Sequence, residues 1–260
     1  MARQNFNLDP TPTGAASVAQ DRWLLARALG LTLAFIALLW FILGVQIAGQ
    51  FDFSMFGVHP RHLAGLLGVL TAPLIHAGIP HLMANTPALL ILGVLALRVY
   101  PRATRAALPF IWLLSGLLVW VFARPDIHIG ASGIAHGLMF FLFVLGLFRR
   151  ERLAIVTSMV VFFLYGSMTH SILPNDPHIS WEYHLAGAIC GAVAAVALRH
   201  ADPLAPKKRY SWELEDDEDD GEDYSYATLS RYAELAELAM GDLQAPRDEE
   251  SAQHRDIEAR

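Results

Sequence analysis

The sequence of 260 residues has little charge and almost no cysteine. Only 17% of its residues are charged, against about 25% in an ordinary soluble domain, and 54% are hydrophobic. This shortage of charge excludes a chain that is soluble throughout and favours a membrane protein. The single cysteine, Cys190, excludes an intrachain disulfide framework. A basic patch with interleaved aromatic residues is also missing, so nothing supports binding to nucleic acid.

Charge is absent altogether from six long apolar runs. Each run has 16 to 22 residues and contains no Asp, Glu, Lys or Arg. A helix needs about 20 residues to cross the hydrocarbon core of a bilayer, so the pattern predicts an all-α membrane protein with six transmembrane helices. The sixth run is short, and we expect its helix to begin earlier, near Trp181. The runs are 28–48, 80–97, 106–123, 127–148, 153–173 and 183–198.

The distribution of arginine predicts how these helices are oriented. With six spans and a cytoplasmic N-terminus, ten arginines of residues 1–200 fall on the inner side, and only Arg61 and Arg124 fall in outer loops. This asymmetry follows the positive-inside rule, so we expect both termini in the cytoplasm. A seventh span at 63–79 would put the N-terminal arginines on the wrong side. We therefore expect 49–79 to be a long outer loop between the first two helices, lying at the membrane interface against protein.

The two ends of the chain differ from its apolar body. Residues 1–21 are polar, lack the features of a secretory signal and are predicted to form a loose cytoplasmic arm. Residues 201–260 hold 18 acidic and 7 basic residues. The negative charges of the block ELEDDEDDGED repel one another, which predicts a largely disordered acidic tail. The intervening residues 22–200 would form the folded domain. Because no signal or transit segment is seen, we expect the cytoplasmic (inner) membrane of a bacterium.

Polar residues inside apolar runs are functional candidates, because they are costly in a membrane. His81 and Asn85 are four residues apart at the start of the second run, so they share one helix face. Ser132 lies in the stretch GASG at 130–133 of the fourth run, where glycine lets another backbone or a substrate approach the hydroxyl. His184 lies at the start of the sixth run.

Small residues predict which of these helices touch. The fourth run has a GxxxG pair at 133–137 and the sixth has another at 187–191, a spacing that allows close helix packing. Contact between the two helices would bring His184 to Ser132. The second, fourth and sixth helices all start on the outer side. Their N-termini, with free N–H groups and partial positive charge, would converge at one depth and suit a developing oxyanion.

Other catalytic chemistries lack their residues. The HExxH motif of a zinc protease is absent, and no apolar run holds the carboxylates that an intramembrane aspartyl protease needs. Cys190 lies in apolar surroundings, where a thiol stays protonated and inert. Ser132 with His184 is the remaining pair of nucleophile and base.

These motifs together resemble the rhomboid family of intramembrane serine proteases over about residues 40–200. The resemblance rests on His76-x4-His81-x3-Asn85, then GASG at 130–133, then His184-x2-Gly187. It implies a six-helix rhomboid-like bundle in which Ser132 is the nucleophile and His184 the general base, without a third acid. It also implies His81, Asn85 and the Ser132 N–H as oxyanion donors, and a structural His76. The supporting positions are His76, Gly130, Gly133, His136, Gly187 and Gly191.

The resemblance further implies what such a chain acts on. Family substrates are mostly single-span membrane proteins, cut near the outer end of a helix that must unwind before attack. They would enter sideways from the bilayer past the fifth helix and the loop 171–182. No metal or cofactor is implied. Position 136 departs from the family pattern: Tyr or Phe commonly stacks on the catalytic histidine there, whereas this chain has His136.

A non-enzymatic function is the alternative. The chain would then be an inactive rhomboid-like binder, or a haem protein using two of its intramembrane histidines, His81, His136, His170 and His184. Haem ligation does not need glycine around Ser132 or Asn85 beside His81. An inactive relative would normally lack the serine or the histidine, and both are present. The sequence therefore favours an intramembrane serine endopeptidase.

Overall fold

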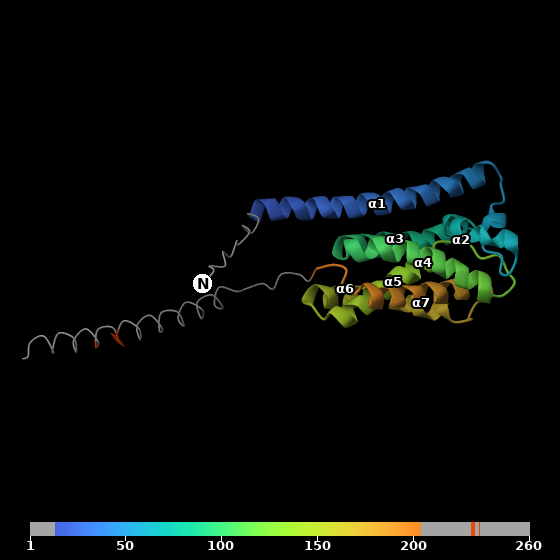
Figure 1. Ribbon diagram of the computed structural model, residues 1–260. Coiled ribbons are helices and arrows are strands. Elements are labelled where there is room, and N and C mark those ends of the chain that lie inside the picture. Colours follow the sequence, from blue (N-terminus) through green and yellow to red (C-terminus); the bar gives the residue numbers. More distant parts are fainter. Residues whose placement is uncertain (1–13, 204–229, 232–233, 235–260) are drawn as a thin grey trace, which may run out of the picture. The chain divides into compact units, whose positions relative to one another are not determined.

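The computed structural model describes residues 14–203 and three isolated tail positions, 230, 231 and 234 (Figure 1). Six helices in this part are long and apolar enough to cross a membrane, which confirms the predicted all-α, six-helix class. The fifth spanning segment continues from α6 through the 3₁₀ helix η4, Gly166–Ile172. The six helices are α1 Gly14–Ala48, α3 Ile79–Val99, α4 Pro101–Phe122, α5 Ser132–Arg149, α6 Arg152–Tyr165 and α7 Trp181–Leu198.

The segment between α1 and α3 contains only short helices, as the arginine distribution predicted. They are η1 Ser54–Phe56, η2 Leu63–Leu66, α2 Gly68–Thr71 and η3 Ala72–Leu74. Its backbone packs tightly on itself at two glycines. A Cβ atom on Gly65 would lie 2.2 Å from the His59 carbonyl oxygen, and one on Gly68 would lie 2.2 Å from the Gly57 carbonyl oxygen. At these two positions the backbone of the segment is buried against other main chain.

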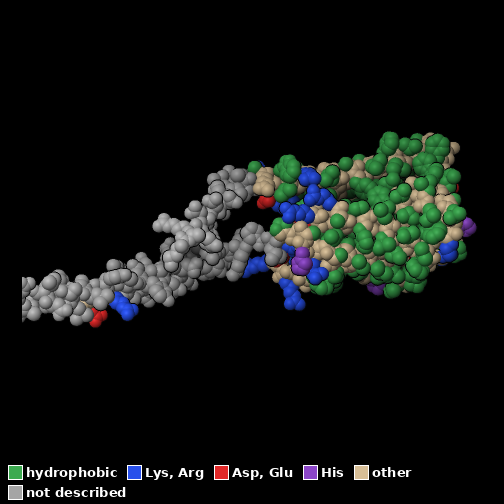
Figure 2. Space-filling model, viewed as in Figure 1, with side chains coloured by type: hydrophobic (Ala, Val, Ile, Leu, Met, Phe, Trp, Pro, Cys, Tyr) green, Lys and Arg blue, Asp and Glu red, His purple; other side chains and the backbone are tan. Residues whose placement is uncertain are grey.

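The two ends of the bundle differ in the side chains that they carry. Hydrophobic side chains cover the helical body, and arginines gather where it ends (Figure 2). We call one end the arginine end, formed by Arg27, Arg98, Arg102, Arg105 and Arg149. We call the other the cavity end, where α3, α5 and α7 begin.

Both chain-end boundaries expected from the sequence need correction. Helix α1 begins at Gly14, so the expected loose arm is wrong for residues 14–21. The Asp21 carboxylate lies 2.7 Å from the Arg98 guanidinium, which ties this turn to α3. At the other end, the buried Asp202 carboxylate accepts hydrogen bonds from the N–H groups of Arg102 and Ala103 and caps α4. The bundle therefore extends beyond residue 200, and the rest of the expected tail lies outside the described residues, apart from positions 230, 231 and 234.

Helix α5 is the central helix of the bundle, with 67% of its residues buried. It crosses α7 with the two backbones in contact. A Cβ atom on Gly187 would lie 2.0 Å from the Gly133 carbonyl oxygen, and one on Gly191 would lie 2.0 Å from that of Gly137. This confirms the contact that the two GxxxG pairs predicted. The spacing of the helices that carry Ser132 and His184 is thus set by main chain.

Candidate active site

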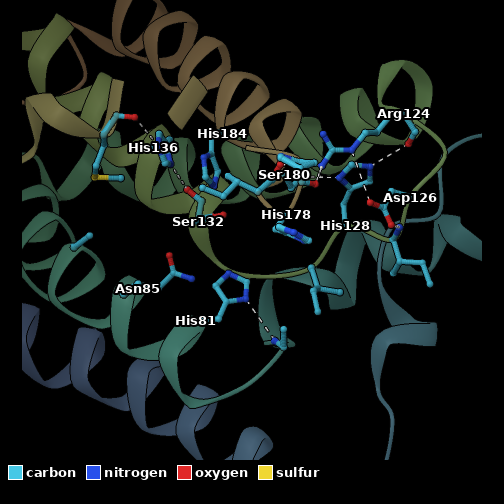
Figure 3. Close-up of a pocket in the computed structure, with 18 of the residues that line it drawn as sticks. His81, Asn85, Arg124, Asp126, His128, Ser132, His136, His178, Ser180 and His184 are labelled. Atoms are coloured by element: carbon cyan, nitrogen blue, oxygen red, sulfur yellow. Dashed lines mark hydrogen bonds and ion pairs between the residues drawn. The ribbon is translucent and has the colours of Figure 1, made fainter. Parts of the chain in front are cut away.

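A cavity of about 710 Å³ opens at the cavity end, among α3, α5, α7 and the loops 123–131 and 173–180. Five polar residues singled out from the sequence line it: His81, Asn85, Ser132, His136 and His184 (Figure 3). They come from the first two turns of three helices that start at the same end. The structure therefore brings together side chains that are separated by up to 103 positions in the sequence.

Ser132 is the first residue of α5 and is 7% exposed. The apolar run predicted a helix from residue 127, but the helix begins five residues later. The reason is an antiparallel bridge, in which the backbones of His128 and Val58 exchange two hydrogen bonds of 2.9 Å. Gly130 then turns the chain with φ +112°, and a Cβ atom there would lie 2.7 Å from His81 Cε1. Glycine at this position therefore permits both the turn and the placement of His81.

His184 is held through its Nδ1 atom, which lies 3.0 Å from both the carbonyl oxygen and the hydroxyl of Ser171. A carbonyl oxygen only accepts hydrogen bonds, so we assign the proton to Nδ1. Nε2 is then free to accept a proton from the cavity. In the described part of the chain, no hydrogen bond joins His184 to the Ser132 hydroxyl. Catalytic hydrogen bonds are commonly long before substrate binds and tighten in the substrate complex.

His136 stacks on His184, with ring centroids 4.1 Å apart and an angle of 12° between the planes. Its Nδ1 lies 2.8 Å from the Ser132 carbonyl oxygen, and its Nε2 lies 2.9 Å from the Ser171 hydroxyl. Nε2 also lies 3.2 Å from the Met168 carbonyl oxygen, so each ring nitrogen faces a carbonyl oxygen that can accept its proton. Histidine at this position therefore stacks as the usual aromatic residue would, and it also adds hydrogen bonds.

Ser171 is a site residue that sequence reasoning missed. It receives the Nδ1 proton of His184 on its carbonyl oxygen and turns its hydroxyl towards His136 or the Met168 carbonyl oxygen. It lies in η4, thirteen residues before His184 and across a loop. No helical spacing relates the two positions, so the sequence carries no signal of their contact.

His81 and Asn85 present donors to the cavity. His81 Nδ1 accepts a hydrogen bond from the Ala77 N–H at 3.4 Å, which assigns its ring proton to Nε2. The Asn85 side-chain nitrogen is buried and has no hydrogen-bond partner among the described residues. A buried donor without a partner costs about 1–3 kcal/mol. An acceptor that entered the cavity would offset this cost.

His76 is buried beside the cavity and does not line it. Its Nε2 accepts a hydrogen bond from the Ala131 N–H at 3.3 Å, and its ring packs at 63° on that of His81. Burial, with a smaller contribution from His81, lowers the pKa of His76 from 6.5 to about 4. The ring is therefore neutral at pH 7 and supports both the turn before Ser132 and the His81 ring.

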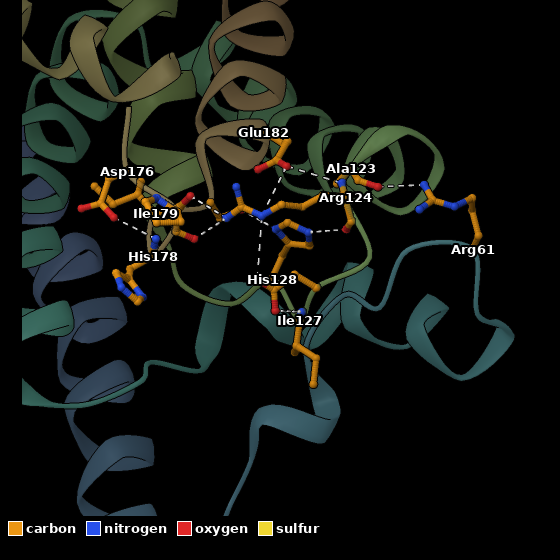
Figure 4. A network of polar contacts seen from close by, with 12 residues as sticks. Arg61, Ala123, Arg124, Ile127, His128, Asp176, His178, Ile179 and Glu182 are labelled. Atoms are coloured by element: carbon orange, nitrogen blue, oxygen red, sulfur yellow. Dashed lines mark hydrogen bonds and ion pairs between the residues drawn. The ribbon is translucent and has the colours of Figure 1, made fainter. Parts of the chain in front are cut away.

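A polar network at the cavity rim joins the two loops that border the cavity (Figure 4). The Arg124 guanidinium donates hydrogen bonds of 2.9 Å to the carbonyl oxygens of Pro177 and Ile179, and it lies 3.7 Å from the Glu182 carboxylate. The His128 ring contacts the Ser180 hydroxyl, and burial lowers the pKa of His128. Sequence reasoning used Arg124 only for topology and missed this network, because both loops are irregular.

Comparison with known proteins identifies the family. The family model described as the Rhomboid domain matches residues 63–201. The chain belongs to the rhomboid family. The match contains all the candidate site residues, from His76 to Gly191. Six apolar helices and this membership make it a multi-pass membrane protein of that family.

Relatives of this rhomboid chain occur in mycobacteria. An uncharacterized protein of Mycobacterium tuberculosis is 39% identical over 198 residues, which cover 72% of this chain and 81% of the relative. An uncharacterized protein of Mycobacterium leprae is 33% identical over 186 residues, which cover 68% of this chain and 73% of the relative. No solved structure matches the sequence.

Proposed function

We propose that this rhomboid is an intramembrane serine endopeptidase in which Ser132 is the nucleophile and His184 the general base. The observation that carries the proposal is the shared cavity: Ser132, His184, His81 and Asn85 line it from three helices. Family membership supports the same reaction, because rhomboids are usually intramembrane proteases. The alternative of haem ligation is disfavoured, because both ring nitrogens of His136 are already engaged and its ring lies flat on His184.

The first chemical step is attack on the peptide bond. Ser132 Oγ adds to the carbonyl carbon while His184 Nε2 takes the hydroxyl proton, and the Ser171 carbonyl oxygen stabilises the resulting imidazolium through Nδ1–H. The carbonyl oxygen becomes negative. The N–H of Ser132, free at the start of α5, the His81 Nε2–H and the Asn85 amide would donate to it.

The second half of the reaction restores the enzyme. His184 gives its proton to the leaving amine, the C–N bond breaks, and the acyl group stays on Ser132 Oγ. Water then attacks the ester while His184 takes its proton, and the proton returns to Ser132 as the acid leaves. His184 is neutral at the start of each half of the reaction, with its proton on Nδ1 and with Nε2 able to accept another.

The substrate would be a single-span membrane protein that enters the cavity between α3 and α6. Tyr165 of α6 and Pro87 of α3 both line the cavity, and the Tyr165 hydroxyl donates to the Pro87 carbonyl oxygen at 3.1 Å. This hydrogen bond would have to break as a substrate passes. The arginine distribution would place the enzyme in the cytoplasmic membrane with both termini inside, so that the cavity opens outwards.

Cleavage of one fluorogenic transmembrane substrate by matched variants tests the proposal. Ser132→Ala and His184→Ala should be inactive. Asn85→Ala should retain turnover lower by about 10²–10³, as for one lost oxyanion donor, and His81→Ala should be at least as impaired. His178→Ala, which changes another histidine of the cavity lining, is the control and should remain active.

Labelling with a fluorophosphonate separates the protease from the inactive binder. The wild type should be labelled, and Ser132→Ala and His184→Ala should not be. Wild-type cleavage by Ser132→Ala would overturn the assignment of the nucleophile. Folded wild-type protein that is never labelled and cleaves nothing would show an inactive binder.

A further inference from the structure

A second cavity, separate from the candidate active site, lies on the side of the bundle that α1 covers. It is a groove of about 560 Å³ lined from α1, α3, α4 and α5. Its two side chains with polar hydrogens are already bonded: the Thr32 hydroxyl donates to the Ala28 carbonyl oxygen, and the Trp112 indole donates to that of Leu70. The groove therefore offers apolar surface alone, at the depth of the transmembrane helices, and suits a hydrocarbon chain.

The groove meets a basic pocket at the arginine end. This pocket, of about 210 Å³, is lined by Arg27, Arg102 and Arg105, and it shares Leu31 and Leu97 with the groove. Figure 2 shows arginines gathered at this end beside a hollow in the surface. An apolar groove that leads to three guanidinium groups has the polarity of a single amphiphile with an anionic head.

Two neighbouring carboxylates interact with groups other than the three guanidinium groups of this pocket. Asp21 pairs with Arg98, and the Asp202 carboxylate accepts from the main-chain N–H groups of Arg102 and Ala103. Among the described residues, no carboxylate forms an ion pair with the guanidinium groups of Arg27, Arg102 or Arg105. The three arginines are exposed, and Arg27 is held over the Trp23 ring at 5.5 Å.

We propose that this site binds an anionic glycerophospholipid, with its phosphate among the three arginines and one acyl chain in the groove. Within a bilayer an acyl chain gains little by leaving other chains, so selectivity must come from the head group. Each arginine near an anionic head group contributes roughly fivefold in affinity. The acidic tail, with its carboxylates, fits the arginines but not the groove, so a lipid accounts for both features.

Lipid binding to the full chain in detergent tests the proposal, with native mass spectrometry as the readout. The probes are dioleoyl phosphatidylglycerol and dioleoyl phosphatidylcholine, which differ in head group but not in acyl chains. Phosphatidylglycerol should bind more tightly. Arg102→Gln with Arg105→Gln should weaken it by roughly 25-fold, two arginines at about fivefold each. The control Arg22→Gln with Arg150→Gln removes the same charge outside the pocket and should change binding less than about twofold.

The groove has its own pair of variants. Leu31→Trp fills the strip shared by both cavities and should weaken phosphatidylglycerol binding. Leu33→Trp adds the same ring to an exposed position of α1 outside both cavities and should not.

Three results would overturn the proposal. They are equal binding of the two lipids, equal loss in both arginine pairs, and equal binding by both tryptophan variants. A fourth result concerns the acidic residues of 213–223. If selective lipid binding appears only when they are neutralised, the arginines bind the tail in the native chain, and the proposal is overturned as well. None of these readouts depends on proteolysis, so failure here leaves the proposed peptidase function untouched.

Discussion

At the scale of single residues, Ser171 contacts both imidazole rings of the site. Ser171→Ala removes the hydroxyl, and with it the contacts to both rings, but keeps the carbonyl oxygen that accepts from His184 Nδ1, so the His184 tautomer survives. A hydrogen bond worth about 1 kcal/mol predicts a fall in kcat of about fivefold with unchanged KM. Ser171→Thr should restore kcat. The control is Ser167→Ala, an exposed serine of the same 3₁₀ helix, and an equal loss there would contradict a positioning role.

His136 gives a second prediction at this scale. His136→Phe keeps an aromatic face on His184 but loses the hydrogen bonds to the Ser132 carbonyl oxygen and Ser171. We expect activity within about 25-fold of wild type, because each of these two neutral hydrogen bonds contributes about 1 kcal/mol, or about fivefold. His136→Ala loses the stack as well and should be slower than His136→Phe. If His136→Phe is as inactive as His184→Ala, His136 itself is the general base.

Sequence reasoning found the candidate residues whose neighbours are fixed by helical spacing or by glycine. His81 and Asn85 share a face because they are four apart, and the two GxxxG pairs correctly predicted that the helices of Ser132 and His184 touch. Ser171 and Arg124 could not be found in this way. Their contacts cross irregular loops, where spacing along the chain does not determine distance in space.

At the scale of helices, the seam between α3 and α6 is joined by the hydrogen bond from Tyr165 to the Pro87 carbonyl oxygen. Tyr165→Phe removes this bond and keeps the ring. If substrates enter here, cleavage of a transmembrane substrate should become a few times faster, because a bond of about 1 kcal/mol no longer opposes opening. Labelling by a small fluorophosphonate should not change, since that reagent needs no open seam. Equal acceleration of both reactions would place the effect at the catalytic residues instead.

Helix boundaries were predictable where the length needed to span a membrane decides them. The last helix begins at Trp181 as expected. The fourth spanning helix begins at Ser132 instead of 127, because bridge bonds to Val58 hold residue 128 in extended backbone. Helix α1 extends back to Gly14 through polar residues, where an ion pair and good helix formers replace apolar patterning.

At the scale of the whole molecule, a buried neutral histidine makes stability depend on pH. Burial lowers the pKa of His76 to about 4, whereas the unfolded chain binds this proton near 6.5. The stabilising contribution is complete above pH 6.5 and is lost as the pH falls towards 4, to a total of about 3 kcal/mol.

Thermal unfolding in detergent between pH 7.5 and 4.5 measures this effect. The melting temperature of the wild type should fall with pH, and that of His76→Gln should fall less, because glutamine can accept from the Ala131 N–H without titrating. His178→Gln, an exposed histidine, serves as the control and should follow the wild type. Identical slopes for wild type and His76→Gln would contradict the assignment.

The close contact of α5 and α7 at their glycines also limits which substitutions such a sequence can accept. Most helix interfaces accommodate substitution by exchanging the volumes of facing side chains, so that a larger residue on one helix is offset by a smaller one on the other. Where Gly187 meets the Gly133 carbonyl oxygen, there is no side chain on either helix to exchange. Divergence is thereby directed to the lipid-facing surfaces. The distance between the helices that carry Ser132 and His184 can stay constant while residues on the exterior of the protein are substituted.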